Sequence, residues 1–430
     1  MKSTKRKQTR LDTKERRTNQ SCKVYSLKFD KSKLSKKTKN QLDMIFLEGK
    51  WLYNHILATC DPFNFQTKTK EVNVLVKDKT EIRALTNISS QMKQGIQGRM
   101  VQSIQNLSKS KKAGRKVGRL KYKSKLSCIP LPQYHNGNTG THKIIGKNHI
   151  KIQGIKQKIR VNGIDQIPKG VEYANANLIK VGSDYYIKLT TFQDKVEAVI
   201  PDKSIGIDFG CQTQLTLSDG TKIEFQVPVS PRIKRLDRKI MRKNRTYSKN
   251  KVKDQLKREK AYNRVSSKKK DIRNKVVSVL TKNFRTICFQ DESIHAWHSG
   301  RHGKKIQNSG IGGIIEALKH KAHTPIEVGK FFPSTQLCPK CGCLNKLSLS
   351  EREYKCDCGF SMDRDTKSAL CILEEGLRQN KIPTERRDYK PVESEASAGS
   401  FKNTLAGISG ISCKFYSVKQ EAITPIYRQW

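Results

Sequence analysis

Four cysteines in the C-terminal half have the spacing of a metal-binding ribbon. Two residues separate Cys338 from Cys341, and after fourteen more residues Cys356 and Cys358 follow, one residue apart. A pair of thiolates on a tight turn directs both sulfurs at one tetrahedral ion, and four thiolates leave no open position for water. We therefore expect one structural Zn²⁺ held by these four residues, with Cys343 as an extra thiol within reach of the second pair.

Acidic residues at three separate places could hold divalent cations. Asp208 lies inside the apolar segment SIGIDFG, Glu292 follows the apolar segment TICF, and Asp365 ends the motif DRD. Mg²⁺ prefers carboxylate oxygens, and two such ions can stabilise the attacking and leaving oxygens of a phosphodiester. Each acid alone has a simpler interpretation: Asp363 or Asp365 could cap a helix, and Asp291 or Glu292 could be a surface residue at a strand end. Together, beside a ribbon and a strongly basic chain, they favour a nuclease.

The elements around these acids follow from hydrophobic patterning. The segments SIGIDFG, LTL and KIEFQV predict three consecutive strands from Ser204, with a turn at 218–220. Because strand neighbours alternate faces, Asp208 should point away from Ile205, Ile207 and Phe209. This pattern fits the opening of an RNase H-like domain. Further strands are expected at 286–289 and 325–331, with helices near 311–321 and after the DRD motif.

The charge of the chain indicates a polyanionic partner. The 430 residues contain 87 Lys and Arg against 38 Asp and Glu, a net charge of +49. Nucleic acid is the first candidate partner and an anionic membrane surface the second. No apolar run approaches the roughly 18–20 residues that a membrane span needs, and no signal-peptide core follows the basic start. With five of twelve cysteines clustered at 338–358, we expect metal ligands and isolated thiols in a reducing compartment.

Two basic segments are expected to contact phosphates. One is a glycine-bearing loop at 108–125, for which an ordinary solvated linker is the alternative. The other runs from Pro231 to Lys275 with 20 Lys and Arg against 4 Asp and Glu, and should form a helical hairpin broken near Tyr247. Such a density of like charge repels itself unless a polyanion is bound. The residues expected to contact nucleic acid are Arg115, Lys116, Arg119, Lys121, Lys123, Arg235, Arg238, Arg242, Arg245, Lys249 and Arg364.

The remaining segments predict an α+β multidomain chain. Residues 1–20 should be a disordered basic arm, either a solvated tail or a segment that grips nucleic acid. A strand at 22–29 precedes helices at 37–58 and about 79–108, and the short alternating runs of 128–197 predict an antiparallel barrel or sandwich. Residues 381–430 lose the pattern and are expected to be a disordered tail.

Several motifs together resemble the TnpB family of transposon-encoded RNA-guided DNA nucleases. They are IGIDFG…LTLSDG, FQDESIHAW, FFPSTQLCPKCG…LSLSEREYKCDCGF and DRDTKSA, with GRLKYKSK and WLYN in the first half. Compact type V CRISPR effectors and Fanzor proteins are relatives of this family. The resemblance covers residues 20–378. It implies a wedge β-barrel at 21–200 with a helical recognition insertion at about 35–125. It also implies a RuvC-like α/β nuclease domain at 201–332 and 363–380, with an inserted zinc ribbon at 333–362.

By the same resemblance, the catalytic acids that bind two Mg²⁺ are Asp208, a Glu of the second motif and Asp365. Many relatives place that Glu where Gln290 stands; Glu292, two residues on, shares its strand face and can serve. A second departure is Lys367, where Asn is usual. The resemblance implies cleavage of double-stranded DNA that matches a bound guide RNA and lies beside a short flanking motif.

Two alternatives remain at this point: a guide-dependent DNA-binding protein that does not cut, and a non-guided basic RNA-binding zinc protein. Neither a membrane nor a small-molecule substrate is expected. The implied location is the cytoplasm or nucleoid of a prokaryote, or the nucleus if the chain is a eukaryotic relative.

Overall fold

The computed structural model describes residues 2–59, 61–76, 79–133, 140–196, 199–243, 248–300, 302–348, 351–380 and 411–415. The chain forms two compact units, Met1–Glu197 and Ala198–Trp430, and each is described by itself. The division falls beside residue 200, where the sequence predicts the change from the first half to the nuclease-like half.

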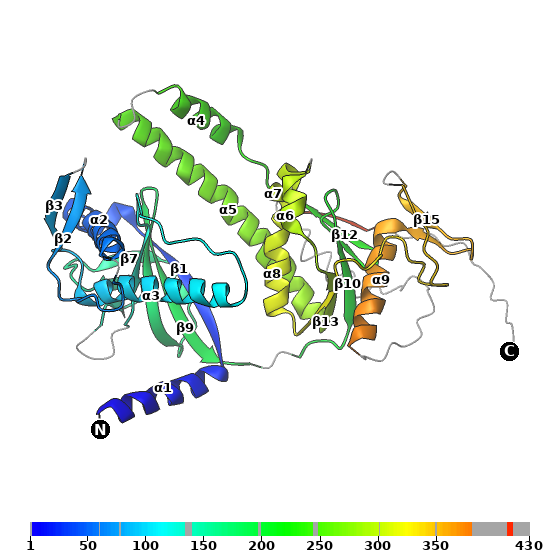
Figure 1. The fold of residues 1–430 in the computed structure, drawn as a ribbon, viewed down its shortest axis with the longest axis horizontal. Helices are drawn as coiled ribbons and strands as arrows, with labels where there is room; N and C mark the ends of the chain where they lie inside the picture. Colours follow the sequence, from blue (N-terminus) through cyan, green and yellow to red (C-terminus); the bar gives the residue numbers. More distant parts are fainter. Residues whose placement is uncertain are drawn as a thin grey trace. The chain divides into compact units, whose positions relative to one another are not determined.

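An antiparallel seven-stranded sheet forms the first unit (Figure 1). Its edges approach each other where the Thr141 amide donates to the Gln133 carbonyl over 2.9 Å, so the sheet is nearly closed. The predicted barrel is thus present as a nearly closed sheet. In spatial order the strands are β4 (Cys128–Leu131), β8 (Glu172–Val181), β9 (Asp184–Asp194), β1 (Gln20–Phe29), β7 (Ile159–Asn162), β6 (His149–Ile152) and β5 (His142–Ile145).

Two long helices, α2 (Lys36–Ala58) and α3 (Ser90–Lys112), supply the helical insertion. Each begins at a serine, Ser35 or Ser89, whose side chain accepts a backbone N–H of the first turn. Apolar residues at helical spacing enter one core with the sheet, among them Leu42, Ile45, Met92, Ile96, Ile129 and Ile187. Short 3₁₀ turns lie at Lys31–Lys33 and Ile164–Gln166.

Two predictions for the first unit are wrong. Residues 79–84 are not the start of a helix but strand β3 (Lys79–Ala84), which pairs with β2 (Glu71–Val76) and leaves Ile82 69% exposed. Their two-residue alternation matches a hairpin, and the helix starts only after its cap. Residues 2–18 form helix α1 (Lys2–Thr18) instead of a disordered arm. Arg17 at its end pairs with Glu172 over 2.6 Å and stacks on Phe192, which fixes the helix to the sheet.

A six-stranded mixed sheet forms the second unit. Strands β10, β13 and β14 run parallel, and β11, β12 and β17 continue antiparallel from β10. The three strands predicted from Ser204 are therefore confirmed. In spatial order they are β14 (Thr324–Val328), β13 (Thr286–Gln290), β10 (Ser204–Phe209), β11 (Leu215–Leu217), β12 (Thr221–Phe225) and β17 (Ile411–Phe415).

Helices cover both faces of this sheet. One face packs on α5 (Lys249–Asn283), α7 (Gly303–Ser309) and α8 (Ile311–Lys321) through a large apolar cluster. The other packs on α9 (Arg364–Gln379) through a smaller cluster that includes Cys288, Ile372 and Leu373. Helix α4 (Pro231–Met241) precedes α5 as the predicted hairpin, and α6 (Ile294–Ser299) follows β13.

The cysteine ribbon has its own small core. Strands β15 (Glu353–Lys355) and β16 (Ser361–Asp363) pair antiparallel, and Tyr354 and Phe360 pack with Cys338 beneath them. Five residues of the tail expected to be disordered, 411–415, instead form β17, whereas 381–410 and 416–430 lie outside the described residues. Among the helices that the structure describes, none is long and apolar enough to span a membrane.

Candidate active site

Strand β10 presents Asp208 on the face that packs against α9. Its neighbours Ile205, Ile207 and Phe209 enter the cluster on the opposite face, as the alternation of a strand requires. On the α9 side, a side chain at Gly206 would place its Cβ 2.1 Å from the Ala369 carbonyl oxygen. Glycine is needed at 206 because the helix backbone lies directly on the strand. The predicted orientation of Asp208 is confirmed.

This close packing sets Asp365 beside the same edge of the sheet. Asp365 lies one helical turn before Ala369, and Asp208 lies two residues beyond Gly206. Glu292 reaches this edge from the neighbouring parallel strand: Ile207 pairs with Phe289, and Glu292 follows the end of β13. Three elements distant in sequence thus bring three carboxylates to one end of the sheet.

The pKa of Asp208 is affected by both of the other acids. Burial, followed by the charges of Asp365 and Glu292, raises the pKa of Asp208 to about 8, while Arg364 and Lys367 oppose the shift. Burial also raises the pKa of Glu292 to about 7, with a contribution from Asp291 and an opposing one from Lys330. Carboxylates held close to one another resist ionisation, and a bound cation would favour their charged form.

The carboxylates nevertheless lie further apart than the ligands of a closed metal site. Among the described residues, one set of at least three His, Cys, Asp or Glu side chains has ligand atoms all within 4.8 Å of one another, and that set is the thiolate cluster. Asp208, Glu292 and Asp365 do not meet this spacing.

The other acids near this edge have structural partners. Asp363 caps α9, since its Oδ1 accepts the Thr366 amide over 3.0 Å, and its other oxygen accepts from Lys222 Nζ over 2.8 Å. The helix-cap interpretation therefore holds for Asp363. Asp291 is exposed, whereas the Glu292 side chain is half-buried. Sequence reasoning missed Gly206 and Lys222; a lone glycine within a strand was the available signal for the first.

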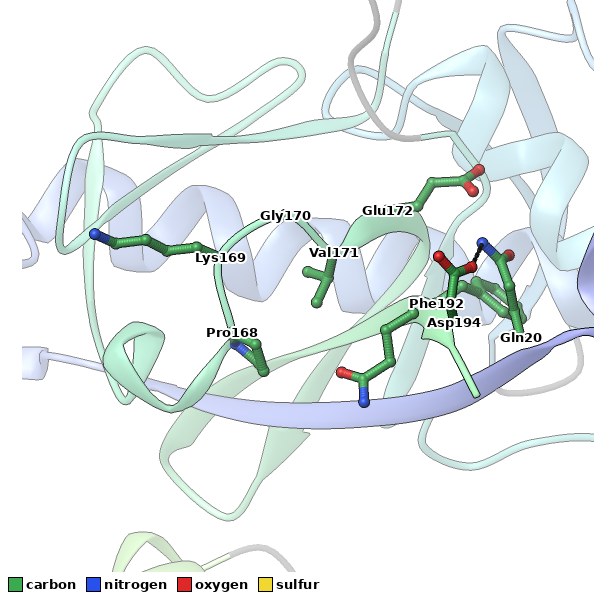
Figure 2. Close-up of a pocket in the computed structure, with 9 residues that line it drawn as sticks. Gln20, Pro168, Lys169, Gly170, Val171, Glu172, Phe192 and Asp194 are labelled. Atoms are coloured by element: carbon green, nitrogen blue, oxygen red, sulfur yellow. Dashed lines mark hydrogen bonds between the residues drawn. The ribbon is translucent and has the colours of Figure 1, made fainter. Parts of the chain in front are cut away.

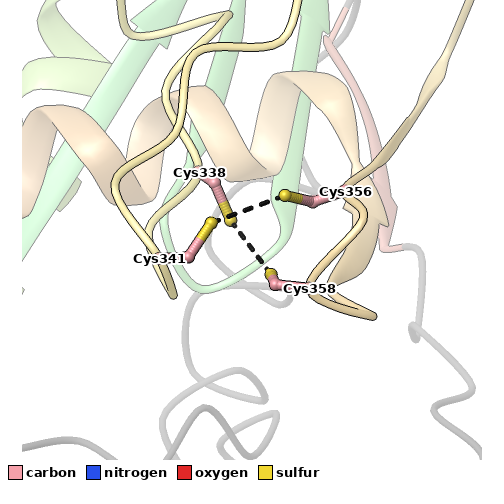
Figure 3. Close-up of side chains that lie close together, drawn as sticks. All are labelled: Cys338, Cys341, Cys356 and Cys358. Carbon is pink, nitrogen blue, oxygen red and sulfur yellow. Dashed lines mark hydrogen bonds between the residues drawn. The ribbon is translucent and has the colours of Figure 1, made fainter.

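The four thiols predicted to hold zinc form a compact cluster (Figure 3). The Cys338 and Cys358 sulfurs are 3.7 Å apart, and the Cys341 and Cys356 sulfurs are 3.5 Å apart. Sulfurs bound tetrahedrally to zinc at about 2.3 Å would be separated by roughly 3.8 Å. The donor set therefore fits one zinc ion. Cys343 is exposed and lies outside the cluster, so the second pair of ligands is the predicted Cys356 and Cys358.

The predicted nucleic-acid contacts fall into two exposed groups, one in each unit. Arg115, Lys116, Arg119, Lys121 and Lys123 are exposed on the loop after α3. Asn54 fixes this loop through two hydrogen bonds with the backbone of Lys123, of 2.8 and 3.0 Å. The loop therefore presents its cations from an anchored backbone.

The second group is on the α4–α5 hairpin. Arg235, Arg238, Arg242 and Lys249 are exposed, while the apolar side of α4 is buried. Asp254 holds the hairpin closed through a 2.6 Å ion pair with Lys243. A hollow of about 350 Å³ on α4 is lined by Arg232, Arg235, Leu236 and Lys239. Arg245 lies outside the described residues.

Arg364 differs from the other predicted contacts. Its Nε is 3.6 Å from Asp365 Oδ1, its Nη1 donates to the Ser348 carbonyl over 3.3 Å, and its side chain is only 15% exposed. It is thus positioned to neutralise the acidic edge, and its contact with nucleic acid remains a prediction.

A shallow pocket of about 230 Å³ lies in the first unit, between the end of β9 and the turn before β8 (Figure 2). It contains none of the predicted site residues, and Gln20 donates to Asp194 at its rim over 3.2 Å. Its lining is Gln20, Pro168, Lys169, Gly170, Val171, Glu172, Phe192, Gln193 and Asp194.

Residues 313–372 match the family model of the Cas12f1-like TNB domain. A curated Streptomyces pristinaespiralis protein named "Putative RNA-guided DNA endonuclease" is 26% identical in an alignment of 225 residues that covers 49% of this chain. Both matches support the resemblance to a TnpB/Cas12f-like family over part of the chain. The TNB match contains the four thiolates and Asp365 but not Asp208 or Glu292. The chain spans about half of the curated relative, 55% of its length.

Two solved structures show weaker likeness to the chain. The cryo-EM structure of a Cas12f1–sgRNA–target DNA complex matches with a TM-score of 0.41 and 14% identity, over 66% of this chain and 71% of that one. A CRISPR–Cas12f ternary complex matches with a TM-score of 0.26 and 15% identity, over 78% and 81% of the two chains. Likeness at this level carries no argument about the site.

Proposed function

We propose that the chain is an RNA-guided DNA endonuclease. It would cut DNA that matches a bound guide RNA and lies beside a short flanking motif, and its gene would accompany a transposon. The observation that carries the proposal is the convergence of Asp208, Glu292 and Asp365 at one end of the sheet, where the charges of Glu292 and Asp365 raise the pKa of Asp208. The TNB family-model match over residues 313–372 and the name of the curated relative support it.

In this proposal the second unit is a RuvC-like domain, and its three acids hold two Mg²⁺. The ions, when bound, would activate water and neutralise charge on the scissile phosphate. Asp208 and Asp365 stand on elements whose separation is set by Gly206, so they offer fixed ligands. Glu292 follows the last residue of β13 and is not held by the sheet ladder, so it is the acid freest to adjust.

The other parts would hold and position nucleic acid. The two exposed basic groups, on the loop after α3 and on the α4–α5 hairpin, would bind the phosphates of guide RNA and target DNA. The guide would read sequence by base pairing, and the first unit would serve as wedge and recognition regions. The thiolates would hold one structural Zn²⁺, because four sulfurs leave no open position for water.

The proposal is tested with the chain purified together with its guide RNA and mixed with matching duplex DNA and Mg²⁺. Asp208→Asn should lower the cleavage rate on the order of 10³-fold, because several kcal/mol of charge stabilisation is lost. Binding of the target should persist. Asp219→Asn is the control: it changes an acid in the turn between β11 and β12, and an amide oxygen can still accept the Thr221 N–H.

Equal cleavage by the Asp208→Asn variant would exclude the catalytic role of this acid. A wild-type complex that binds matching DNA but never cuts it would identify a guided DNA-binding protein instead. Binding of RNA without any guided binding of DNA would indicate a non-guided RNA-binding zinc protein.

A further inference from the structure

Gln290, the last residue of β13, holds the loop that follows β14. Its amide nitrogen lies within hydrogen-bond distance of the carbonyls of Gly329, Lys330 and Phe332, at 3.3, 3.1 and 2.8 Å. The residue is only 7% exposed, so its amide depends on these protein partners and not on water for its hydrogen bonds. A carboxylate could not make them, because it has no hydrogen to donate. An amide is thus required two residues before Glu292.

Lys367, in the first turn of α9, is completely buried. Its Nζ donates to the carbonyls of Ser334 and Leu337 over 2.9 and 3.0 Å and lies 4.1 Å from the ring centroid of Tyr354. A buried ammonium is tolerated only with such partners. Leu337 directly precedes the ligand Cys338, and Tyr354 belongs to the ribbon core. The lysine two residues after Asp365 therefore ties α9 to the ribbon.

Ser334 joins these two side chains into one chain of hydrogen bonds. Its hydroxyl donates to Gln290 Oε1 over 3.0 Å, and its carbonyl accepts from Lys367. Ser334 is 4% exposed. A continuous buried path thus runs from the end of β13 through the loop to α9 and the ribbon. Removing the hydrogen-bond partner of any of these three residues would lower the free energy of unfolding, by about 1–3 kcal/mol where a neutral group is left unsatisfied and by more where a charge is.

We propose that Gln290, Ser334 and Lys367 are positioning residues that fix the backbone beside Glu292 and Asp365, and so set where these two acids stand when they bind a cation. The inference rests on the proposed function in taking those two acids as cation ligands. Neither Gln290 nor Lys367 bonds to the acids. Each instead fixes the backbone two residues from one of them, and Ser334 makes the two positions dependent on each other.

The test is binding of Mn²⁺ to the purified full chain, measured from the electron paramagnetic resonance signal of free Mn²⁺, which needs no cleavage. Gln290→Met and Lys367→Met keep the approximate side-chain length and remove the polar atoms. Each should raise the Kd for Mn²⁺ about tenfold, a typical loss for outer-shell partners. In the double variant, the Kd for Mn²⁺ should rise by less than the product of the two single increases, because either change already breaks the shared path of hydrogen bonds.

Gln214→Met is the matched control. Gln214 is 1% exposed and its amide makes comparable bonds in the same unit, including one of 2.6 Å from the Phe225 amide. This variant should lower the melting temperature and leave the Kd for Mn²⁺ unchanged. Ser334→Ala is the milder test: it removes only the hydroxyl link, keeps the carbonyl that Lys367 uses, and should raise the Kd about threefold, less than an outer-shell loss.

A melting-temperature loss with an unchanged Mn²⁺ Kd in the Gln290 and Lys367 variants would overturn the proposal, as would fully multiplicative effects in the double variant. If those variants do not fold, an unchanged Kd in Ser334→Ala overturns it. Wild-type protein that binds no Mn²⁺ overturns it as well. Wild-type protein that binds Mn²⁺ but does not cut DNA would overturn the proposed function alone.

Discussion

The thiolate cluster and the carboxylate edge, which is the end of the sheet that carries Asp208, Glu292 and Asp365, are assembled in opposite ways. The four sulfurs come from one ribbon, between Cys338 and Cys358, and already stand at the spacing of a tetrahedral ion. The three carboxylates come from three segments spread over more than 150 residues and do not reach that spacing, and the charges of Glu292 and Asp365 raise the pKa of Asp208. A local closed site suits a structural ion, whereas a distributed open site suits ions that must admit water and substrate.

The largest expected effect comes from removing a thiolate. Cys356→Ser should reduce bound zinc from one equivalent to none and expose the ribbon to limited proteolysis. The free energy of zinc binding is folding free energy for such a module, on the order of 10 kcal/mol. Zinc content by elemental analysis and the positions of proteolytic cuts measure the outcome.

Cys343→Ser is the control for this prediction. Cys343 is an exposed cysteine within the same ribbon but outside the cluster, so its variant should keep one zinc. Loss of zinc from Cys343→Ser with retention in Cys356→Ser would reverse the ligand assignment.

A smaller effect is expected where the carboxylate edge depends on packing. Gly206→Ala would place a Cβ 2.1 Å from the Ala369 carbonyl, so α9 must move away from β10. Overpacking of this kind costs about 1–3 kcal/mol in unfolding free energy. It should also weaken Mn²⁺ binding by displacing Asp365 from Asp208, while zinc content stays at one.

Gly313→Ala in α8 is the comparison for that variant. A Cβ there would meet only the Arg273 side chain, at 3.4 Å or more, and alanine favours a helix by up to about 1 kcal/mol. Denaturant unfolding should show a loss for Gly206→Ala and none for Gly313→Ala. Equal stability of the two variants would mean that α9 is not held as tightly as described.

The smallest expected effect is the pH dependence of cation binding. The pKa values of Asp208 and Glu292 are raised to about 8 and about 7, so bound protons must leave before a cation binds. Affinity for Mn²⁺ should therefore rise between pH 6 and pH 8, by at most about tenfold per pH unit for each proton displaced. Calorimetric titrations at three pH values would measure it.

The same acids set the sign of stability against pH without a cation. Between about pH 4, where these acids titrate when unfolded, and about pH 8, the folded state holds more protons than the unfolded state. The unfolding free energy of the cation-free chain should therefore receive a falling contribution from these two acids as pH rises through that range. Asp208→Asn should flatten the fall; an unchanged slope would show that the Asp208 carboxyl is not destabilised in the fold.

Much of the second unit could be predicted because its signals are local. Alternation around Asp208 set the buried face of β10, the spacing of four cysteines identified the cluster, and charge density with an interruption near Tyr247 predicted the hairpin. The N-terminal half was harder. Ile82 fits the helical spacing of the apolar residues that follow it, which extends the predicted helix back to residue 79. The pairing of residues 79–84 with β2 overrides that pattern and leaves Ile82 exposed.

The supports of the site were not predictable, because they depend on contacts between distant segments. No spacing rule shows that Gln290 meets the loop at 329–332, or that a lysine in the first turn of α9 is buried under Tyr354. In the sequence, each residue differs from the usual residue of the resembling family, but nothing there indicates its contacts. Their bonds in the structure are those of buried residues that hold neighbouring backbone segments.

The pairing of β17 with β12 has a consequence for any shortened form of the chain. In the described sheet, β12 is bonded to β11 on one side and to residues 411–415 on the other. A protein ending at residue 380 would keep every cysteine ligand and all three acids, yet would expose a row of unpaired backbone amides and carbonyls along β12. Such an unpaired strand is a template for strand addition between molecules. The shortened protein would therefore be prone to self-association even though its three acids remain in place.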